Sequence, residues 1–243
     1  VFKLRSQIIG EIRSFFGEQD YLEVETPMMH SVLGGAAAKP FTTHHNALDM
    51  DLYLRIAPEL YLKRLVVGGL EKVFEINRNF RNEGLSTKHN PEFTMLEYYT
   101  AYADFEDQMI FIESLFKSVT ERVLGSSVVE TNDHKYDFSK PFKRLTLIGA
   151  VAEKLSVKEE DLREREVLES LAKKSHLEDY KDLSEGRLLF ELFEAKVEES
   201  LDQPTFITGY PKEISPLSRI SDDDPDFVDR FESDLADFSG SRY

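Results

Sequence analysis

The stretch "NRNFRNEGLSTKHNPEFTMLEYYTAY", residues 77–102, decides the fold of this chain. Two runs with the composition of β-strands, Lys72 to Glu83 and Glu92 to Tyr99, flank the loop sequence "GLSTKHNP". Two such runs joined by a polar loop predict an antiparallel hairpin. The length of the loop is typical of a loop with a function.

Alternation along the second strand places Glu97 among apolar side chains. Side chains of a strand point to its two faces in turn, so Glu97 shares a face with Phe93, Met95 and Tyr99. A carboxylate without a partner is unfavourable in such surroundings. We therefore expect Glu97 to face a cation, and the ammonium group of a ligand would serve.

Four residues around the loop form a candidate nucleotide site: Arg81, Glu83, His89 and Phe93. A guanidinium binds phosphate through two parallel charged hydrogen bonds, and an aromatic ring stacks on a purine. The chain contains neither "GxxxxGK[ST]" nor "GxGxxG". Taken singly, the four residues fit plainer roles. Arg81 and Glu83 are more typical of a solvated ion pair, Phe93 of a core position and His89 of an ordinary loop.

Composition predicts a soluble, cytoplasmic protein with one sizeable core, or one core with a small appended subdomain. The 243 residues are 41% apolar, and no apolar run is long enough to span a membrane. The chain has no cysteine, which excludes a disulfide framework and a thiolate nucleophile. With a formal net charge of −16, any binding of nucleic acid must be local.

The rest of the chain alternates between helical and extended patterns. Apolar residues recur at helical spacing from Leu4 to Phe16, "YLEVETP" (residues 21–27) alternates as a strand, and "ELYLKRLVV" (residues 59–67) predicts a helix. Residues 145–201 have a charged, mainly helical pattern, which we interpret as an exposed helical insertion. Residues 233–243 are small and polar, and we expect them to be disordered.

These motifs resemble a known family. "FRNE" (residues 80–83) is similar to motif 2 of the class II aminoacyl-tRNA synthetases, and "YLEVETP" resembles their motif 1. Longer stretches, among them "GGAAAKPF" and "KHNPEFTMLEYYTAYAD", resemble the bacterial class II lysyl-tRNA synthetases. The resemblance covers roughly residues 2–232. It implies an α+β fold, an antiparallel sheet flanked by helices with a helical insertion.

The resemblance implies roles in binding ATP for the residues around the loop. Arg81 would hold the α-phosphate and the charge that develops there, which makes it the candidate catalytic residue. Glu83 would contact the adenine, His89 the outer phosphates, and Phe93 would stack under the adenine ring. Mg²⁺ would neutralise the phosphates, and the matching region assigns it no ligands.

The resemblance also implies a lysine pocket. Glu59 would hold the α-ammonium of L-lysine, and Glu97 and Tyr99 would receive the ε-ammonium. Gly35 and Ala36 would line the pocket through their backbone. This agrees with the separate expectation that Glu97 faces a cation. A carboxylate at the end of the pocket would reject neutral side chains, because they would leave it unpaired.

The implied enzyme is an ATP-dependent ligase of protein biosynthesis. The carboxylate of lysine would attack the α-phosphorus of ATP to give lysyl-adenylate and pyrophosphate, and the lysyl group would then pass to tRNA(Lys). This chemistry needs positioning and charge stabilisation rather than a protein nucleophile. The resemblance further implies a homodimer through motif 1, a cytoplasmic location and no membrane partner.

Residues 1–243 resemble an incomplete catalytic domain. The anticodon-binding barrel of the family would precede residue 1, and motif 3 has no counterpart because residues 233–243 do not match. Two alternatives stay open. One is a paralogue that attaches lysine to elongation factor P. The other is a catalytically weak fragment, or a non-catalytic binding module, derived from the fold.

Overall fold

The chain divides into two compact units, each with buried apolar residues of its own. The computed structural model describes residues 1–234 apart from residues 37, 85–89, 132–133 and 216–217. Among the described residues, the first unit is Val1–Ala103 and the second begins at Asp104. The expected organisation, one catalytic domain with a helical insertion, stays a prediction. Within the described ranges, no helix is long and apolar enough to cross a membrane.

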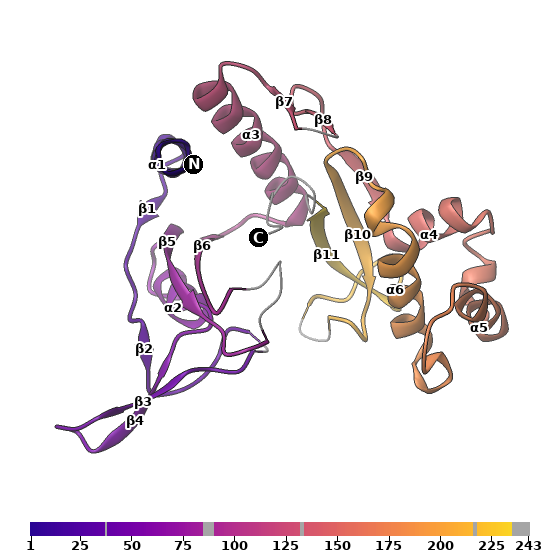
Figure 1. The fold of residues 1–243 in the computed structure, drawn as a ribbon, viewed down its shortest axis with the longest axis horizontal. Helices are drawn as coiled ribbons and strands as arrows, with labels where there is room; N and C mark the ends of the chain where they lie inside the picture. Colours follow the sequence, from indigo (N-terminus) through magenta and orange to yellow (C-terminus); the bar gives the residue numbers. More distant parts are fainter. Residues whose placement is uncertain (37, 85–89, 132–133, 216–217, 235–243) are drawn as a thin grey trace. The chain divides into compact units, whose positions relative to one another are not determined.

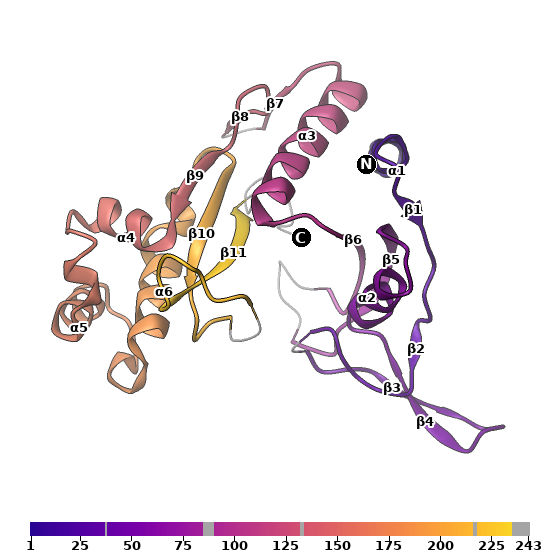
Figure 2. The same ribbon diagram turned by 180° about the vertical axis from the view of Figure 1, so that it is seen from behind.

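The first unit combines helices with two three-stranded sheets (Figure 1 and Figure 2). One sheet has the strand order β1-β5-β6, and the other has the order β2-β4-β3. The elements are α1 (Phe2–Glu18), β1 (Leu22–Glu23), β2 (Met29–His30), β3 (Thr42–His45), β4 (Met50–Leu54), α2 (Glu59–Val67), β5 (Lys72–Phe80) and β6 (Glu92–Thr100).

The hairpin predicted from the sequence is confirmed. β5 and β6 pair in antiparallel fashion from Lys72 opposite Thr100 to Phe80 opposite Glu92. The first strand ends three residues earlier than predicted. The motif 1 segment is also less regular than its alternation suggests. Only its residues in β1 form a strand, and they pair with β5 in parallel.

The two faces of this hairpin are in contact with different helices. Phe74 and Tyr98 lie on one face, and Phe16 of α1 packs against both, with ring centroids 4.6 and 5.2 Å away. On the other face, Lys63 of α2 lies over the ring of Tyr99, with Nζ 5.7 Å from the centroid. The second face is therefore the one that carries Glu97, because residues 97 and 99 share a side of the strand.

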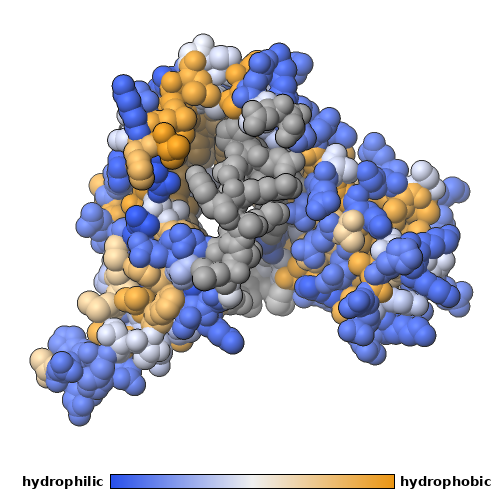
Figure 3. Space-filling view, viewed as in Figure 1, coloured by the Kyte–Doolittle hydropathy of each residue, from blue (hydrophilic) through white to orange (hydrophobic). Residues whose placement is uncertain are grey.

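β3 and β4 form a second hairpin that projects from the rest of the first unit (Figure 1 and Figure 2). Figure 3 shows an almost wholly hydrophilic surface over it, at the lower left. His44 lies between two aspartates, 3.4 Å from Asp49 and 2.9 Å from Asp51. Exposed pairs of this kind contribute little to stability, so we assign the hairpin no structural metal or catalytic group.

The second unit combines a three-stranded sheet with helices. The sheet has the order β11-β10-β9, in which β10 pairs in parallel with β9 and in antiparallel fashion with β11. The α-helices are α3 (Phe105–Leu124), α4 (Leu147–Leu155), α5 (Arg165–Lys174) and α6 (Glu185–Lys196). The strands are β7 (Val128–Glu130), β8 (Lys135–Asp137), β9 (Lys143–Thr146), β10 (Thr205–Pro211) and β11 (Phe227–Asp234). Short 3-10 helices cover Asp161–Arg163, Tyr180–Asp182 and Glu198–Ser200.

Residues 145–201 bury more apolar surface than their charged composition suggests. Members of the buried cluster come from α4, α5, α6 and β10 and include Leu147, Val151, Leu168, Leu188, Leu192 and Ile207. In α5, Leu168, Leu171 and Ala172 follow helical spacing and form a buried stripe, while most of the remaining positions are charged. The expectation that this region is exposed is wrong for these residues, because a short apolar stripe is enough to pack a mainly charged helix against its neighbours. That the region is an insertion stays a prediction.

Residues 233–243 are described only in part. β11 continues through Asp234, so the first two residues of this stretch belong to a strand. The remainder, on which the expectation of disorder depends, lies outside the described residues.

Candidate active site

One face of the β5–β6 hairpin carries three of the nine site residues predicted from the sequence: Phe93, Glu97 and Tyr99. Glu75 and Glu97 lie directly opposite each other across the two strands. Arg81 has the same parity as Glu75, just beyond the end of β5. The backbone thus places Phe93, Glu97 and Tyr99 on one side of the sheet, with Arg81 next to its end.

Glu97 is half-buried and accepts a hydrogen bond, because the hydroxyl of Tyr99 donates to its Oε1 over 2.9 Å. Burial raises the pKa of Glu97 above its ordinary value, and the charges of Glu59 and Glu75 raise it further. The hydrogen bond from Tyr99 and the charge of Lys63 oppose that rise. Ionised Glu97 is therefore short of positive charge, and an ammonium ligand would be stabilised beside it.

Glu59 begins α2 and lies against the predicted glycine loop. A Cβ added at Gly35 would lie 3.1 Å from the Cβ of Glu59 and 3.3 Å from the Cβ of Ala57. Gly35 also has a φ of 93°, a conformation that other residues rarely adopt. Glycine is thus needed here both for the turn and for the close approach. Its neighbour Ala36 is exposed.

Arg81 and Phe93 lie together at the loop end of the hairpin. The guanidinium carbon of Arg81 is 5.2 Å from the centroid of the Phe93 ring. Its Nε donates a long hydrogen bond of 3.5 Å to the carbonyl of Ile56. A charged group and an aromatic ring are therefore adjacent, which is the pairing needed for a phosphate and a purine.

The hairpin also carries a solvated ion pair, the plainer role considered for Arg81 and Glu83, but other residues form it. The exposed cross-strand ion pair is formed by Arg78 and Glu92, 3.1 Å apart, on the opposite face from Arg81. Glu83 is exposed beyond the end of β5. His89 lies outside the described residues, so its predicted contact with the outer phosphates stays a prediction.

A buried ion pair lies next to the site, and sequence reasoning missed it. Arg55 and Glu75 are each 1% exposed, and Nη1 of Arg55 lies 2.7 Å from Oε1 of Glu75. Arg55 also donates from Nε to the carbonyl of Arg78 over 2.9 Å. The hydroxyl of Thr26 donates to the other oxygen of Glu75 over 2.7 Å. The signal was present in "LYLRIAP" and "VFEI", two apolar runs that each hold a single charge of opposite sign.

Lys63 is the second residue that sequence reasoning missed. Its Nζ donates to Oε1 of Glu59 over 2.5 Å, and the same ammonium lies 5.7 Å from the centroid of the Tyr99 ring. The available signal was the spacing, because a glutamate four residues before a lysine on a helix forms a favourable pair.

Among the described residues, no group of three or more histidine, aspartate or glutamate side chains could hold a metal ion. Mg²⁺ that accompanies a nucleotide takes most of its ligands from phosphate oxygens and water, with only one or two carboxylates. The Mg²⁺ that the resemblance implies therefore stays a prediction.

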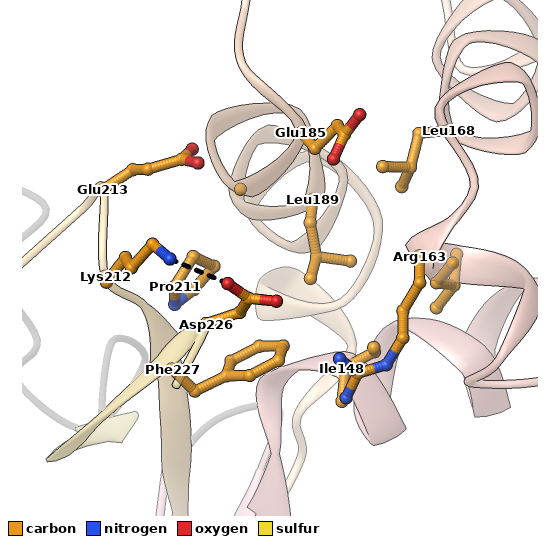
Figure 4. Close-up of a pocket in the computed structure, with 12 residues that line it drawn as sticks. Ile148, Arg163, Leu168, Glu185, Leu189, Pro211, Lys212, Glu213, Asp226 and Phe227 are labelled. Atoms are coloured by element: carbon orange, nitrogen blue, oxygen red, sulfur yellow. Dashed lines mark hydrogen bonds and ion pairs between the residues drawn. The ribbon is translucent and has the colours of Figure 1, made fainter. Parts of the chain in front are cut away.

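A cavity of about 190 Å³ lies in the second unit, lined from α4, α5, α6 and the adjoining ends of β10 and β11 (Figure 4). Its charged groups largely satisfy each other. Lys212 pairs with Asp226 at 2.7 Å, and Arg163 pairs with Asp224 at 2.5 Å. The cavity is also smaller than the roughly 300–1,000 Å³ typical of ligand sites. We assign it no ligand.

Comparison with known proteins gives the family of the chain. A family model described as tRNA synthetases class II (D, K and N) matches residues 1–238. A lysine–tRNA ligase of Sodalis glossinidius (strain morsitans) is 56% identical over 232 residues, which cover 95% of this chain and 46% of that protein. Lysine–tRNA ligases of Yersinia pestis (strain Pestoides F) and Pectobacterium carotovorum subsp. carotovorum (strain PC1) are 54% and 53% identical, with the same coverage. The chain spans about half the length of these curated relatives. Together with its α+β fold, the match shows that this chain belongs to the class II tRNA synthetase family of the D, K and N type.

Proposed function

We propose that this chain carries the lysine-activating site of a lysine–tRNA ligase. The carboxylate of L-lysine attacks the α-phosphorus of ATP, lysyl-adenylate forms and pyrophosphate leaves. The lysyl group then passes to tRNA(Lys). The observation that carries the proposal is Glu97, a half-buried carboxylate that is hydrogen-bonded to Tyr99 and short of positive charge. The names of the similar relatives support the same activity.

The proposed lysine pocket is selective because of its charges. Glu97 and Tyr99 receive the ε-ammonium, and Glu59 receives the α-ammonium. The neighbouring Glu75 is already paired with Arg55, so it adds to the negative potential without needing the ligand. A neutral side chain of the same length would leave Glu97 desolvated and unpaired, which gives strong discrimination.

The proposed ATP site lies at the loop end of the same face. Arg81 holds the α-phosphate and stabilises the charge that develops on it as the carboxylate attacks. Phe93 stacks on the adenine, with Glu83 and His89 as proposed further contacts. In the structure the guanidinium of Arg81 lies against Phe93. A purine that stacks on that side of the ring requires the guanidinium to swing toward the phosphate.

Lysine-dependent exchange of pyrophosphate into ATP tests the proposal on the 243-residue chain. We expect slow exchange with L-lysine and none with norleucine, in which a hydrogen atom replaces the ε-ammonium. Binding of lysine and of ATP is measured separately by calorimetry. If the chain binds neither at millimolar concentrations, the proposed function is wrong for this chain.

Transfer of lysine to tRNA(Lys) and dimer formation belong to the same proposal. The relatives are named as lysine–tRNA ligases, which favours tRNA over elongation factor P as acceptor. Several large exposed apolar residues occur within residues 1–32, which include α1 and the motif 1 segment, and exposed apolar residues favour a partner surface there. They are Val1, Phe2, Leu4, Leu22, Met29 and Val32. Sedimentation and charging of tRNA(Lys) with labelled lysine test these two points, and a cytoplasmic location stays a prediction.

Gly35→Ala is expected to destabilise the chain by about 1–2 kcal/mol, because a Cβ is strained at its positive φ. It is also expected to weaken lysine binding about tenfold, because the new Cβ pushes on Glu59 and misplaces its carboxylate. Gly69→Ala is the matched control. Gly69 has a φ of 102° but nothing within 4 Å of an added Cβ. Calorimetry measures the lysine affinity of the two variants. Equal losses would show that Gly35 does not line the lysine pocket.

A further inference from the structure

An ammonium group of the chain itself lies at the proposed lysine pocket. Lys63 is one turn after Glu59 on α2, and its Nζ donates to Oε1 of Glu59 over 2.5 Å. Glu59 is the carboxylate proposed to hold the α-ammonium of the substrate. The carboxylate of Glu59, which the substrate requires, is therefore already paired with an ammonium group, that of Lys63.

The surroundings of Lys63 separate it from an ordinary surface pair on a helix. Its ammonium lies 5.7 Å from the centroid of the Tyr99 ring, within the range of a cation–π contact. It is also close enough to Glu97 for its charge to oppose the rise in the pKa of that carboxyl. Lys63 thus interacts with all three residues proposed to bind the two ammonium groups of lysine.

We propose that Lys63 is a tethered competitor for the α-ammonium position of the lysine pocket, an inference that rests on the proposed function. While the pocket is empty, Lys63 neutralises Glu59 and holds its carboxylate in place. When lysine binds, its α-ammonium takes over Oε1 of Glu59 and the side chain of Lys63 swings away into solvent. Its side chain is 55% exposed, so this movement meets no packed barrier.

The competition lowers the affinity for lysine because the number of ion pairs at Glu59 stays the same. One pair is exchanged for another, so the net gain from the α-ammonium is small, whereas the ε-ammonium gains Glu97 without displacing anything. Lys63 is in this sense a specificity-determining residue. It shifts the discrimination of the pocket toward the side-chain end of the ligand.

The test compares two ligands and two variants by calorimetry. The ligands are L-lysine and 6-aminohexanoate, which has the same carboxylate and terminal ammonium but no α-ammonium. Lys63→Met removes the competing charge and keeps a good helix former. Arg64→Met is the matched control, because Arg64 is the next residue on α2 but its guanidinium lies over the ring of Tyr61, 5.1 Å from the centroid.

Lys63→Met is expected to tighten lysine binding about two- to fivefold, the range that exposed ion pairs support, and to tighten binding of 6-aminohexanoate by less, because that ligand lacks the α-ammonium for which Lys63 competes. Arg64→Met is expected to change neither. A loss of affinity for both ligands in Lys63→Met would mean that Lys63 binds the ligand's carboxylate, and it would overturn the proposal. So would an unchanged affinity for lysine.

The failure of this inference is distinguishable from the failure of the proposed function. If the unaltered chain binds neither lysine nor 6-aminohexanoate, the proposed function fails, and the inference fails with it. If the unaltered chain binds lysine but Lys63→Met does not bind it more tightly, only the competition is wrong.

Discussion

Glu97→Gln is expected to weaken binding of L-lysine by about 2–3 kcal/mol, or about 30- to 150-fold, and to leave binding of ATP within twofold of its original value. The glutamine keeps the shape of the side chain and a possible hydrogen bond with Tyr99, so the change removes the negative charge and little else. The half-buried position of Glu97 places the effect at the lower end of the range for buried charge pairs. Calorimetric titration of each ligand measures it.

The control for this variant is Glu92→Gln, since Glu92 lies on the opposite face of β6 in an exposed pair with Arg78. Equal losses of affinity for lysine and ATP in Glu97→Gln would contradict the pocket assignment. The pH dependence gives a second check. Because the pKa of Glu97 is raised, lysine affinity is expected to fall as the pH decreases through that raised pKa, and Glu97→Gln abolishes this dependence.

Stability separates loss of binding from loss of fold in Glu97→Gln. A carboxyl whose pKa is higher in the folded state stabilises the fold while it is protonated, below its unfolded pKa. That contribution is lost as the pH rises through the folded pKa. Ionised Glu97 therefore lowers the free energy of unfolding relative to protonated Glu97. The glutamine variant, which has no charge to bury, is expected to be at least as stable as the original chain.

Arg55→Met is expected to lower the free energy of unfolding by about 3–5 kcal/mol, because it leaves Glu75 as a buried charge without its cationic partner. Both side chains of the pair are 1% exposed, so water does not compensate for the loss. Urea denaturation followed by fluorescence and circular dichroism measures the change. Arg78→Met is the matched control. Its exposed pair with Glu92 is worth about 0–1 kcal/mol.

A double variant sharpens this second prediction. Arg55→Met with Glu75→Leu removes both charges and is expected to recover most of the stability, because apolar residues of similar volume replace a buried pair well. A single variant that loses less than about 1 kcal/mol would show that the pair is not buried as described. A double variant no more stable than the single one would show that hydrogen bonds from Thr26 and to Arg78, rather than the unpaired charge, dominate.

Strand alternation was enough to predict which side chains share a face of the hairpin. The two-residue period of β6 places Glu97 with Phe93 and Tyr99, and the pairing of β5 with β6 confirms the strand on which that period rests. The proposed function of this face stays a prediction. The antiparallel pairing of β5 and β6 was predicted from the loop that joins them, because two strands joined by a polar loop form a hairpin. Local rules suffice here because a hairpin pairs neighbours in sequence, so its register depends on little outside residues 72–100.

Contacts between distant segments were not predictable in the same way. Arg55 and Glu75 are twenty residues apart, and Thr26 is a further 29 residues from Arg55. Arg55 and Glu75 each looked like an isolated charge in an apolar run, and only the tertiary fold brings them together with Thr26. The parallel pairing of β1 with β5 was missed for the same reason. In α5 the charged composition concealed a short buried stripe, because burial of a helix depends on spacing rather than on average polarity.

The Arg55–Glu75–Thr26 cluster also has an evolutionary consequence. A change at either charged position alone passes through a protein with an unpaired charge in its interior, which a marginally stable domain does not tolerate. The two positions can change only together, or one after the other if a stabilising substitution elsewhere compensates for the unpaired charge. Substitution at one of them is therefore contingent on the other, although neither is proposed to touch a substrate.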